Sequence, residues 1–217
     1  MSPSNQMKKT AKDLWRLFDW LDSSFDAGKW WPAETRFEIL VGAVLTQNTA
    51  WTNVEKAIVA LRSDGLLEAS ALLAAEPERV AELIYPTGYR NTKAVYLREI
   101  SRWFLNFDGS VSGLGDEDVR SSLLSVRGVG DETADDILLY AYNRRVFIYD
   151  LYCRRFFKAT GIGDFSSYRQ AKTAIDPAVR EAEFSLDQLQ LFHGLIVEWG
   201  KQFRANPLLL SESRALQ

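Results

Sequence analysis

A glycine turn and an isolated carboxylate stand out in the stretch LLSVRGVGDETADDILLYAYNRRVFIYD, which covers residues 123–150. Gly128 and Gly130 flank Val129 where an apolar helical pattern begins, so the backbone amides of residues 128–133 are expected to converge at a helix N-terminus. Free amides and the positive end of the helix dipole attract anions, and glycine lets a phosphate approach the backbone closely. The pattern predicts a phosphate site, and its plain alternative is a tight turn between two helices.

Asp150 follows the apolar segment VFIY and lies eighteen residues after Glu132. Such an aspartate either caps the helix that begins near Leu151 or supplies a carboxylate to a functional site. The helix after the glycine turn also needs a cap, and Asp131 or Thr133 is expected to provide it. The local sequence leaves both roles of Asp150 open.

The elements that must position these groups are helices. Apolar residues recur at helical spacing in several stretches, namely Leu14, Leu17, Phe18 and Leu21; Phe37, Leu40, Val41, Val44 and Leu45; and Leu123, Val126, Ile137, Leu138 and Ala141. Glycine and proline divide the chain into pieces of helix length, and strand-type alternation does not persist anywhere. We therefore expect about nine to eleven helices and essentially no sheet.

Composition narrows the class of protein. The chain has 217 residues, and its 47% hydrophobic content is enough for a substantial core. Its single cysteine, Cys153, excludes an intrachain disulfide and a four-cysteine metal site. No apolar run approaches the roughly 18 residues of a membrane span, and the start lacks the apolar region of a signal peptide. We expect no membrane partner and a cytoplasmic location, at the nucleoid if the source is prokaryotic.

The overall charge is weakly acidic, with a net charge of -3 and a pI of about 5.4. This balance argues weakly against a nucleic-acid partner, since lysine and arginine supply most non-specific affinity for the phosphate backbone. Residues 144–158, however, carry a local excess of four positive charges, contributed by Arg144, Arg145, Arg154, Arg155 and Lys158 against Asp150. An acidic chain can still present one basic face there.

The segment LLSVRGVGDETADDIL resembles the helix-hairpin-helix element, and its continuation to Asp150 resembles the HhH-GPD superfamily of DNA glycosylases. The resemblance implies an all-α, two-lobed fold with an interdomain cleft. One domain is then a contiguous six-helix barrel over 34–142 that includes the hairpin. The second domain combines 1–33 with 143–217. Double-stranded DNA that contains a damaged base would be the partner, and we expect a monomer.

The same resemblance assigns roles to single residues. Asp150 matches the catalytic aspartate of the family. The hairpin would bind DNA through Arg127, Gly128, Gly130, Glu132 and Thr133. The carbonyl groups of Leu124, Val126 and Val129 match positions that hold a monovalent cation beside the phosphate. No cofactor beyond such a cation is implied.

Other motifs extend the resemblance over about residues 34–203. FEILVGAVLTQNTAWTNVEKAI and GYRNTKA resemble the loops whose side chains enter the duplex, and they place Gln47 and Tyr89 in that role. FHGLIVEWGKQF resembles the helix that precedes four cluster cysteines in endonuclease III relatives. Those cysteines are missing, with Phe203 standing near the first, so no iron–sulfur cluster is expected.

Glu132 stands where strand-cleaving members have the lysine that forms a Schiff base, and a carboxylate cannot do so. A monofunctional glycosylase without AP lyase activity is therefore expected. The segment KWWPAE and the cysteine-free tail resemble the 3-methyladenine DNA glycosylase III type, in which aromatic faces bind an alkylated purine. The expected substrate contacts are Trp31, Pro32, Trp51 and Lys201, with Trp30 as a further candidate and His193 expected to be a core residue.

Two alternatives remain open at this point. One is an endonuclease III-like glycosylase for another damaged or mismatched base, with a different lysine cleaving the strand. The other is a non-catalytic helix-hairpin-helix module, which would keep the glycine turn without requiring Asp150. Release of a base that depends on Asp150 would distinguish the leading interpretation, a glycosylase, from this non-catalytic module.

Overall fold

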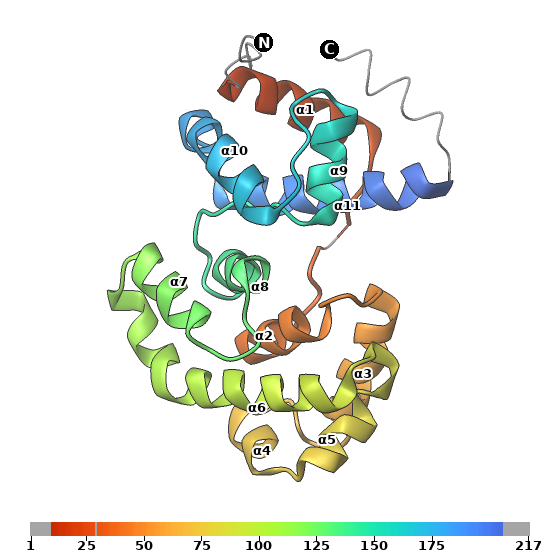
Figure 1. The fold of residues 1–217 in the computed structure, drawn as a ribbon, viewed down its shortest axis with the longest axis vertical. Coiled ribbons are helices and arrows are strands. Elements are labelled where there is room, and N and C mark those ends of the chain that lie inside the picture. The colour runs from red at the N-terminus through yellow and green to blue at the C-terminus, as the bar shows by residue number, and fades with distance from the viewer. Residues whose placement is uncertain (1–9, 29, 206–217) are drawn as a thin grey trace. The chain divides into compact units, whose positions relative to one another are not determined.

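The structure is a computed structural model that describes residues 10–28 and 30–205. These residues form eleven α-helices, two short 3₁₀ segments and one π-helical segment, with no strand among them (Figure 1). The all-α prediction is therefore confirmed. Within the same ranges, none of the helices combines the length and the apolar character that crossing a membrane requires.

The chain forms two compact units. One consists of Trp31–Arg144, and the other combines the two ends of the chain, Met1–Trp30 and Arg145–Gln217. Residues 1–9, 29 and 206–217 of the second unit lie outside the described residues.

The Trp31–Arg144 unit is arranged around its longest helix, α6 (Arg90–Phe107), which contacts α2, α4 and α5 (Figure 1). Its other helices are α2 (Arg36–Leu45), α3 (Trp51–Ser63), α4 (Ala69–Ala74), α5 (Pro77–Leu83), α7 (Asp116–Leu124) and α8 (Asp131–Asp136). Shorter segments are the 3₁₀ turns η1 (Tyr85–Thr87) and η2 (Asp108–Gly113), and the π-helical η3 (Ile137–Ala141), which continues α8.

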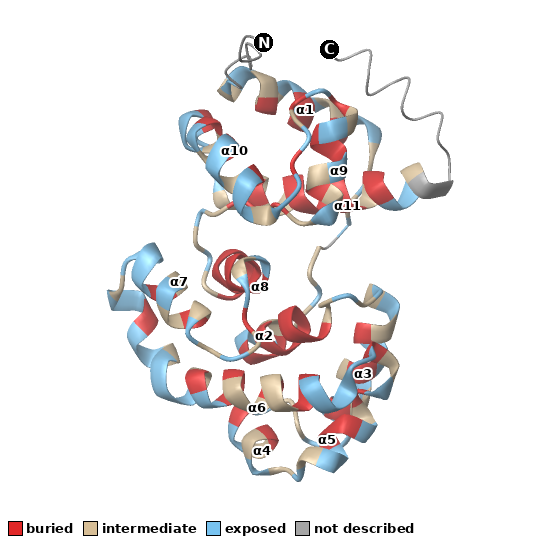
Figure 2. Cartoon of the chain, viewed as in Figure 1, coloured by how far each residue is buried: buried red, intermediate tan, exposed pale blue. Residues whose placement is uncertain are grey.

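Helix α2 forms the centre of this core because it is apolar on almost every side. Thr35 caps it by accepting a hydrogen bond from the Glu38 amide. The predicted apolar positions of α2 are all buried, and Figure 2 shows α2 and α8 largely in the colour of buried residues. A helix that is apolar all round is stable only inside a core, so α2 anchors the turns at both of its ends.

The second unit contains α1 (Ala11–Ser24), α9 (Leu151–Ala159), α10 (Tyr168–Ala182) and α11 (Leu186–Ala205). Helix α1 begins at a reciprocal cap between Thr10 and Asp13 and contacts both α10 and α11. Its predicted face, Leu14, Leu17, Phe18 and Leu21, is buried as expected. Helices α9 and α11 also contact each other, and these two helices carry the acidic and basic side chains of the candidate site.

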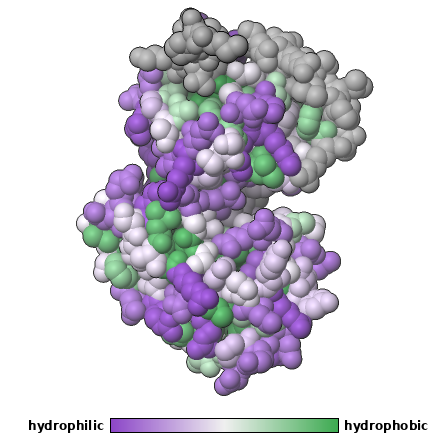
Figure 3. All heavy atoms as spheres, in the orientation of Figure 1, coloured by the Kyte–Doolittle hydropathy of each residue, from purple (hydrophilic) through white to green (hydrophobic). Residues whose placement is uncertain are grey.

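The predicted basic face over residues 144–158 stays a prediction, although several of its side chains have partners. Arg144 belongs to the first unit, where it donates to two carbonyls and pairs with Asp116. Arg145 and Arg154 each donate to a backbone carbonyl of the second unit, and Lys158 pairs with an acidic neighbour, Asp164. Asp116 and Asp164 offset the charges of Arg144 and Lys158, whereas a carbonyl acceptor leaves the charge of an arginine in place. The face drawn in Figure 3 is mostly hydrophilic with smaller apolar patches.

Candidate functional site

The glycine hairpin, residues 125–130, is a tight turn that packs against α6. Gly128 has φ +94°, and the ring of Tyr96 occupies the space where a side chain at this position would begin. At this position any other residue would be disfavoured by the positive φ angle, and its side chain would also collide with the Tyr96 ring. Gly130 has an ordinary extended backbone and open space around it. The two glycines therefore serve different purposes: Gly128 allows the turn to close, and Gly130 leaves the start of α8 open.

The capping prediction for α8 is wrong. Gly130 is the N-cap, and no side chain caps the helix. Asp131 instead pairs with Arg120, at 2.9 Å, and Arg120 also binds the buried Asp135 at 2.7 Å. Burial lowers the pKa of Arg120, but hydrogen bonds and charge attraction from both aspartates outweigh this effect and raise it. Because Arg120 balances Asp131, the negative charge beside the hairpin is smaller than the sequence suggests.

Gln47 is joined to the hairpin. Its amide nitrogen donates to the Gly128 carbonyl at 2.8 Å and to the Thr133 hydroxyl at 3.0 Å. The Thr133 side chain is buried in this contact, and its binding to a DNA phosphate stays a prediction. Gln47 would have to break both hydrogen bonds to enter a duplex, and its insertion stays a prediction.

Tyr89 protrudes from the turn before α6. Its side chain is 76% exposed, and its backbone has φ +48°. Trp31 and Asn48, at the other predicted contact segments, also have positive φ, although they are not glycine. Such residues cost about 1 to 3 kcal/mol each and tend to gather at functional sites. The exposure of Tyr89 is compatible with its predicted insertion.

The remaining hairpin residues lie at the surface or in the turn itself. Arg127 and Glu132 are exposed. The Val126 carbonyl accepts the Val129 amide at 3.0 Å and keeps a second lone pair. The part of the chain that the structure describes contains no cluster of acidic, histidine or cysteine side chains that could hold a metal ion. A cation held by the carbonyls of Leu124, Val126 and Val129 stays a prediction.

Asp150 fills the first of the two roles that the sequence left open, and its role in a functional site stays a prediction. It is the N-cap of α9, where one carboxylate oxygen accepts the Cys153 amide at 2.7 Å. The other oxygen lies 3.8 Å from Nε2 of His193 on α11, and 14% of the Asp150 side chain is exposed. The cap orients the carboxylate without covering it completely. The prediction that Asp150 faces a cleft is not tested by this arrangement.

Two neighbours of Asp150 are more restricted. His193 is 4% exposed, as expected for a core residue, and its ring meets Trp30 edge to face. Burial, followed by the nearby Asp150 charge, raises the pKa of the Cys153 thiol well above its usual range. A buried neutral thiol is a poor nucleophile, so Cys153 is not a candidate for the reactive group at the start of α9.

Trp31, Pro32 and Trp51 come together as expected. The Trp31 ring stacks on Tyr140 with centroids 4.8 Å apart and meets Trp51 at 5.4 Å. All three predicted residues line a cavity of about 30 Å³, together with the acidic residues Glu38 and Glu55. This volume fits about one water molecule, so a purine would need the open side of the cluster or a movement of these rings.

Lys201 lies in the other unit, beside Trp30. Its ammonium group is 5.3 Å from the centre of the Trp30 ring and 3.4 Å from Glu198. Lys201 and His193 thus both contact Trp30, and all three belong to the unit that carries Asp150. The further candidate Trp30 therefore lies beside His193 and Lys201.

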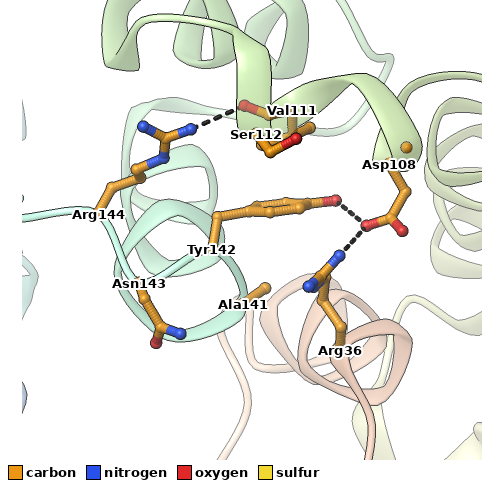
Figure 4. Close-up of a pocket in the computed structure, with 9 residues that line it drawn as sticks. Arg36, Asp108, Val111, Ser112, Ala141, Tyr142, Asn143 and Arg144 are labelled. Atoms are coloured by element: carbon orange, nitrogen blue, oxygen red, sulfur yellow. Dashed lines mark hydrogen bonds and ion pairs between the residues drawn. The ribbon is translucent and has the colours of Figure 1, made fainter.

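A larger cavity, of about 540 Å³, lies in the Trp31–Arg144 unit and is lined by Arg36, Asp108, Tyr142 and Arg144, among others. Figure 4 shows the Arg36 guanidinium and the Tyr142 hydroxyl both directed at Asp108, at 2.7 and 2.9 Å. Burial and the Asp108 hydrogen bond raise the pKa of Tyr142. These groups satisfy one another, and none of the predicted site residues lines this cavity.

Comparison with known proteins agrees with this architecture. Residues 41–180 match the family model described as HhH-GPD superfamily base excision DNA repair protein. A Methanocaldococcus jannaschii protein named as a DNA repair glycosylase is 37% identical over 196 residues, covering 88% of each chain. The structure of H. pylori 3-methyladenine DNA glycosylase bound to 1,N6-ethenoadenine is 33% identical, with a TM-score of 0.73, and the match covers 88% of this chain and 97% of that one.

A non-covalent complex of endonuclease III with DNA has a TM-score of 0.73 at 18% identity, with 93% of this chain and 94% of that chain covered. At this identity the likeness concerns the fold alone. The chain belongs to the HhH-GPD superfamily of base excision DNA repair proteins. Within this superfamily it is a DNA glycosylase, as the resemblance predicted.

Proposed function

We propose that the protein is a monofunctional DNA glycosylase that hydrolyses the N-glycosidic bond of alkylated purines such as 3-methyladenine. The observation that carries this proposal is the Asp150 carboxylate, which the Cys153 amide orients while part of it stays exposed. Cleavage of a glycosidic bond passes through a cationic, oxocarbenium-like state. A carboxylate held in place stabilises that charge and can orient the attacking water.

The assignment as monofunctional rests on the amines of this chain. Glu132 occupies the hairpin position of the Schiff-base lysine and is exposed there without an amine. In the same unit, the Lys93 amine is buried and donates to three oxygen atoms. It is not available to attack a deoxyribose. The residue at position 132 therefore supports hydrolysis rather than strand cleavage.

The aromatic cluster supports an alkylated purine as substrate. The rings of Trp31 and Trp51 offer π faces, and the carboxylates of Glu38 and Glu55 line the same cavity. Rings attract a cationic methylated base by about 0.5 to 2 kcal/mol; the Glu55 carboxylate adds attraction of the same sign, whereas Glu38 is paired with Arg62 at 2.7 Å. The similar H. pylori protein is named as a 3-methyladenine glycosylase, which is consistent with this choice.

The hairpin and the protruding turn provide the proposed DNA contacts. Amides at the start of α8 would bind a strand phosphate, and Tyr89, with Gln47 once released from the hairpin, would fill the space left by the extruded base. We propose domains 34–142 and 1–33 with 143–217, acting as a cytoplasmic monomer. With one cysteine in the sequence, an iron–sulfur cluster is not proposed.

Release of free base from methylated duplex DNA, resolved by chromatography, tests this function. The wild-type protein is expected to release 3-methyladenine, and Asp150→Asn is not. Asp164→Asn, at an exposed aspartate paired with Lys158, is the matched control and should keep full activity. No release by the wild type, or equal release by Asp150→Asn, would contradict the proposal.

Borohydride treatment of the protein on abasic-site DNA tests the monofunctional assignment separately. No covalent adduct is expected, because no free amine has been placed at the hairpin. A trapped adduct would show that another lysine forms a Schiff base. That result would favour the endonuclease III-like alternative.

A further inference from the structure

Lys93 is a buried lysine in the first turn of α6. Its side chain is 2% exposed, and its ammonium group donates to the Leu45 carbonyl at 2.8 Å, the Thr49 hydroxyl at 2.7 Å and the Thr87 carbonyl at 3.0 Å. These three hydrogen bonds use all the donors that an ammonium group has. All three acceptors are uncharged oxygen atoms, so dipoles rather than a carboxylate hold this buried positive charge.

Keeping this charge inside the protein is costly. Burial lowers the pKa of Lys93 from 10.5 to about 8, because the protein interior favours the neutral amine over the charged ammonium group. A position that required only packing would favour an apolar side chain of similar size. The three directed hydrogen bonds are what an apolar residue could not supply.

The acceptors belong to three different segments. Leu45 ends α2, Thr49 lies in the turn of residues 46–50, here called the Gln47 turn, and Thr87 lies in residues 85–89, here called the Tyr89 turn. The Thr49 hydroxyl also approaches the Thr87 carbonyl, at 2.6 Å, and thereby joins the two turns directly. The Lys93 amide donates to the Tyr89 carbonyl at 2.9 Å. One side chain thus connects the core helix to both turns.

The network continues to the hairpin. The Thr49 hydroxyl lies 3.1 Å from the Gln47 carbonyl, and the Gln47 side chain donates to the Gly128 carbonyl. Asn48 and Tyr89 both have positive φ within these turns. Strained backbone of this kind persists only where its surroundings hold it in place. Lys93 and Thr49 make polar contacts that hold the backbone of the two turns in this conformation.

We propose that Lys93 is a positioning residue that locks the Gln47 turn and the Tyr89 turn into one geometry, so that both meet the DNA duplex together. The part of this proposal in which the two turns meet the duplex rests on the proposed function. Lys93 itself touches neither base nor phosphate in this role. Its effect passes through the two turns, and an ordinary contribution to stability would instead affect the whole unit.

Amide hydrogen exchange on the free protein tests the lock without DNA. Lys93→Met keeps an apolar stem and removes the donors, and it should speed exchange at residues 46–50 and 85–89 while α3 and the centre of α6 stay protected. Lys56→Met, at an exposed lysine of α3, is the control and should change nothing. Unchanged exchange in the two turns, or a uniform rise across the unit, would overturn the proposal.

A second pair of variants covers the case in which Lys93→Met does not fold. Thr49→Val removes the hydroxyl with little change in shape, and Thr49→Ser keeps it. The valine variant should speed exchange in both turns and weaken binding to methylated duplex by about tenfold, the equivalent of one lost hydrogen bond. The serine variant should stay within about twofold of the wild type. Equal behaviour of the two variants would refute the lock.

Failure of the proposed function gives a different result. A wild-type protein that neither binds methylated duplex nor releases base would overturn the glycosylase assignment. The exchange measurements on the free protein would still decide the role of Lys93. Local loosening of both turns without any loss of duplex binding would show that Lys93 orders the turns but does not position them for DNA.

Discussion

The turns of the Trp31–Arg144 unit and the surroundings of Asp150 are built in different ways. The turn cluster, which consists of the hairpin, the Gln47 turn and the Tyr89 turn, depends on unusual backbone angles and on hydrogen bonds to carbonyl groups. The Asp150 cluster, which consists of Asp150, His193, Trp30 and Lys201, depends on side chains presented by regular helices and the segment before α2.

This difference implies different sensitivities to mutation. The turn cluster should be disrupted by changes that alter backbone freedom, since its shape is the feature that we propose to bind a strand. The Asp150 cluster should tolerate changes of shape better than changes of charge, because a charged carboxylate is the proposed reactive feature. The following variants test this contrast, from the largest expected effect to the smallest.

Asp150→Asn and Asp150→Ala should both reduce base release by about a thousandfold or more, because neither can stabilise a developing cation. Asparagine can still accept the Cys153 amide, whereas alanine loses the cap and should lower the free energy of unfolding by about 1 kcal/mol. Release assays and urea denaturation measure the two effects. Substantial base release by either variant would remove Asp150 from the reaction.

Gly128→Ala should lower the free energy of unfolding by about 3 kcal/mol, from the positive φ and the collision with Tyr96. Gly130→Ala has open space and should change it by less than about 0.5 kcal/mol, while its added methyl group weakens duplex binding. Urea denaturation and duplex titration at two salt concentrations measure this contrast. If Gly130→Ala binds duplex as well as the wild type, the phosphate site at the start of α8 is wrong.

Lys93 makes the stability of the fold depend on pH. Its pKa is about 8 in the folded chain and near 10.5 when unfolded, so between these values the unfolded chain binds more protons. The contribution of Lys93 to stability is therefore least favourable below pH 8 and rises by up to about 3 kcal/mol as pH approaches 10.5. Urea denaturation at several pH values should show a rise in the wild type relative to Lys93→Met. Parallel curves would contradict the lowered pKa.

Lys201→Gln should have the smallest effect. Its contact with the Trp30 ring is partly exposed and is worth about 0.5 to 1 kcal/mol, or a factor of two to five in base release. Lys201→Arg keeps the charge and should retain most of the activity. A loss of more than a hundredfold in Lys201→Gln would place Lys201 among the groups that touch the substrate rather than beside Trp30 as a support.

The sequence predicted the local features well. Helical periodicity identified the buried faces of α1 and α2, and paired glycines marked the hairpin. Capping of α8 was wrong because Asp131 is bound by Arg120, eleven positions earlier in the chain. Tyr96 was not predicted at all, since its contact with Gly128 joins segments that are far apart in sequence.

Lys93 was also missed, although a signal was present. Leu97 and Ile100 are buried on the same face of α6, four and seven positions after Lys93. A lysine on such an apolar face is buried unless its chain reaches solvent. The usual expectation of an exposed lysine concealed this pattern.

The sequence alone determined the helical class, the place of the glycine hairpin, the absence of a lysine at position 132 and the lack of cysteine ligands for a cluster. Only the tertiary structure decided that Gln47 binds the hairpin, that Lys93 joins two turns and that His193 lies beside Asp150. Helix periodicity and turn geometry depend on neighbouring residues. Hydrogen-bond partners separated by tens of residues depend instead on how the helices pack.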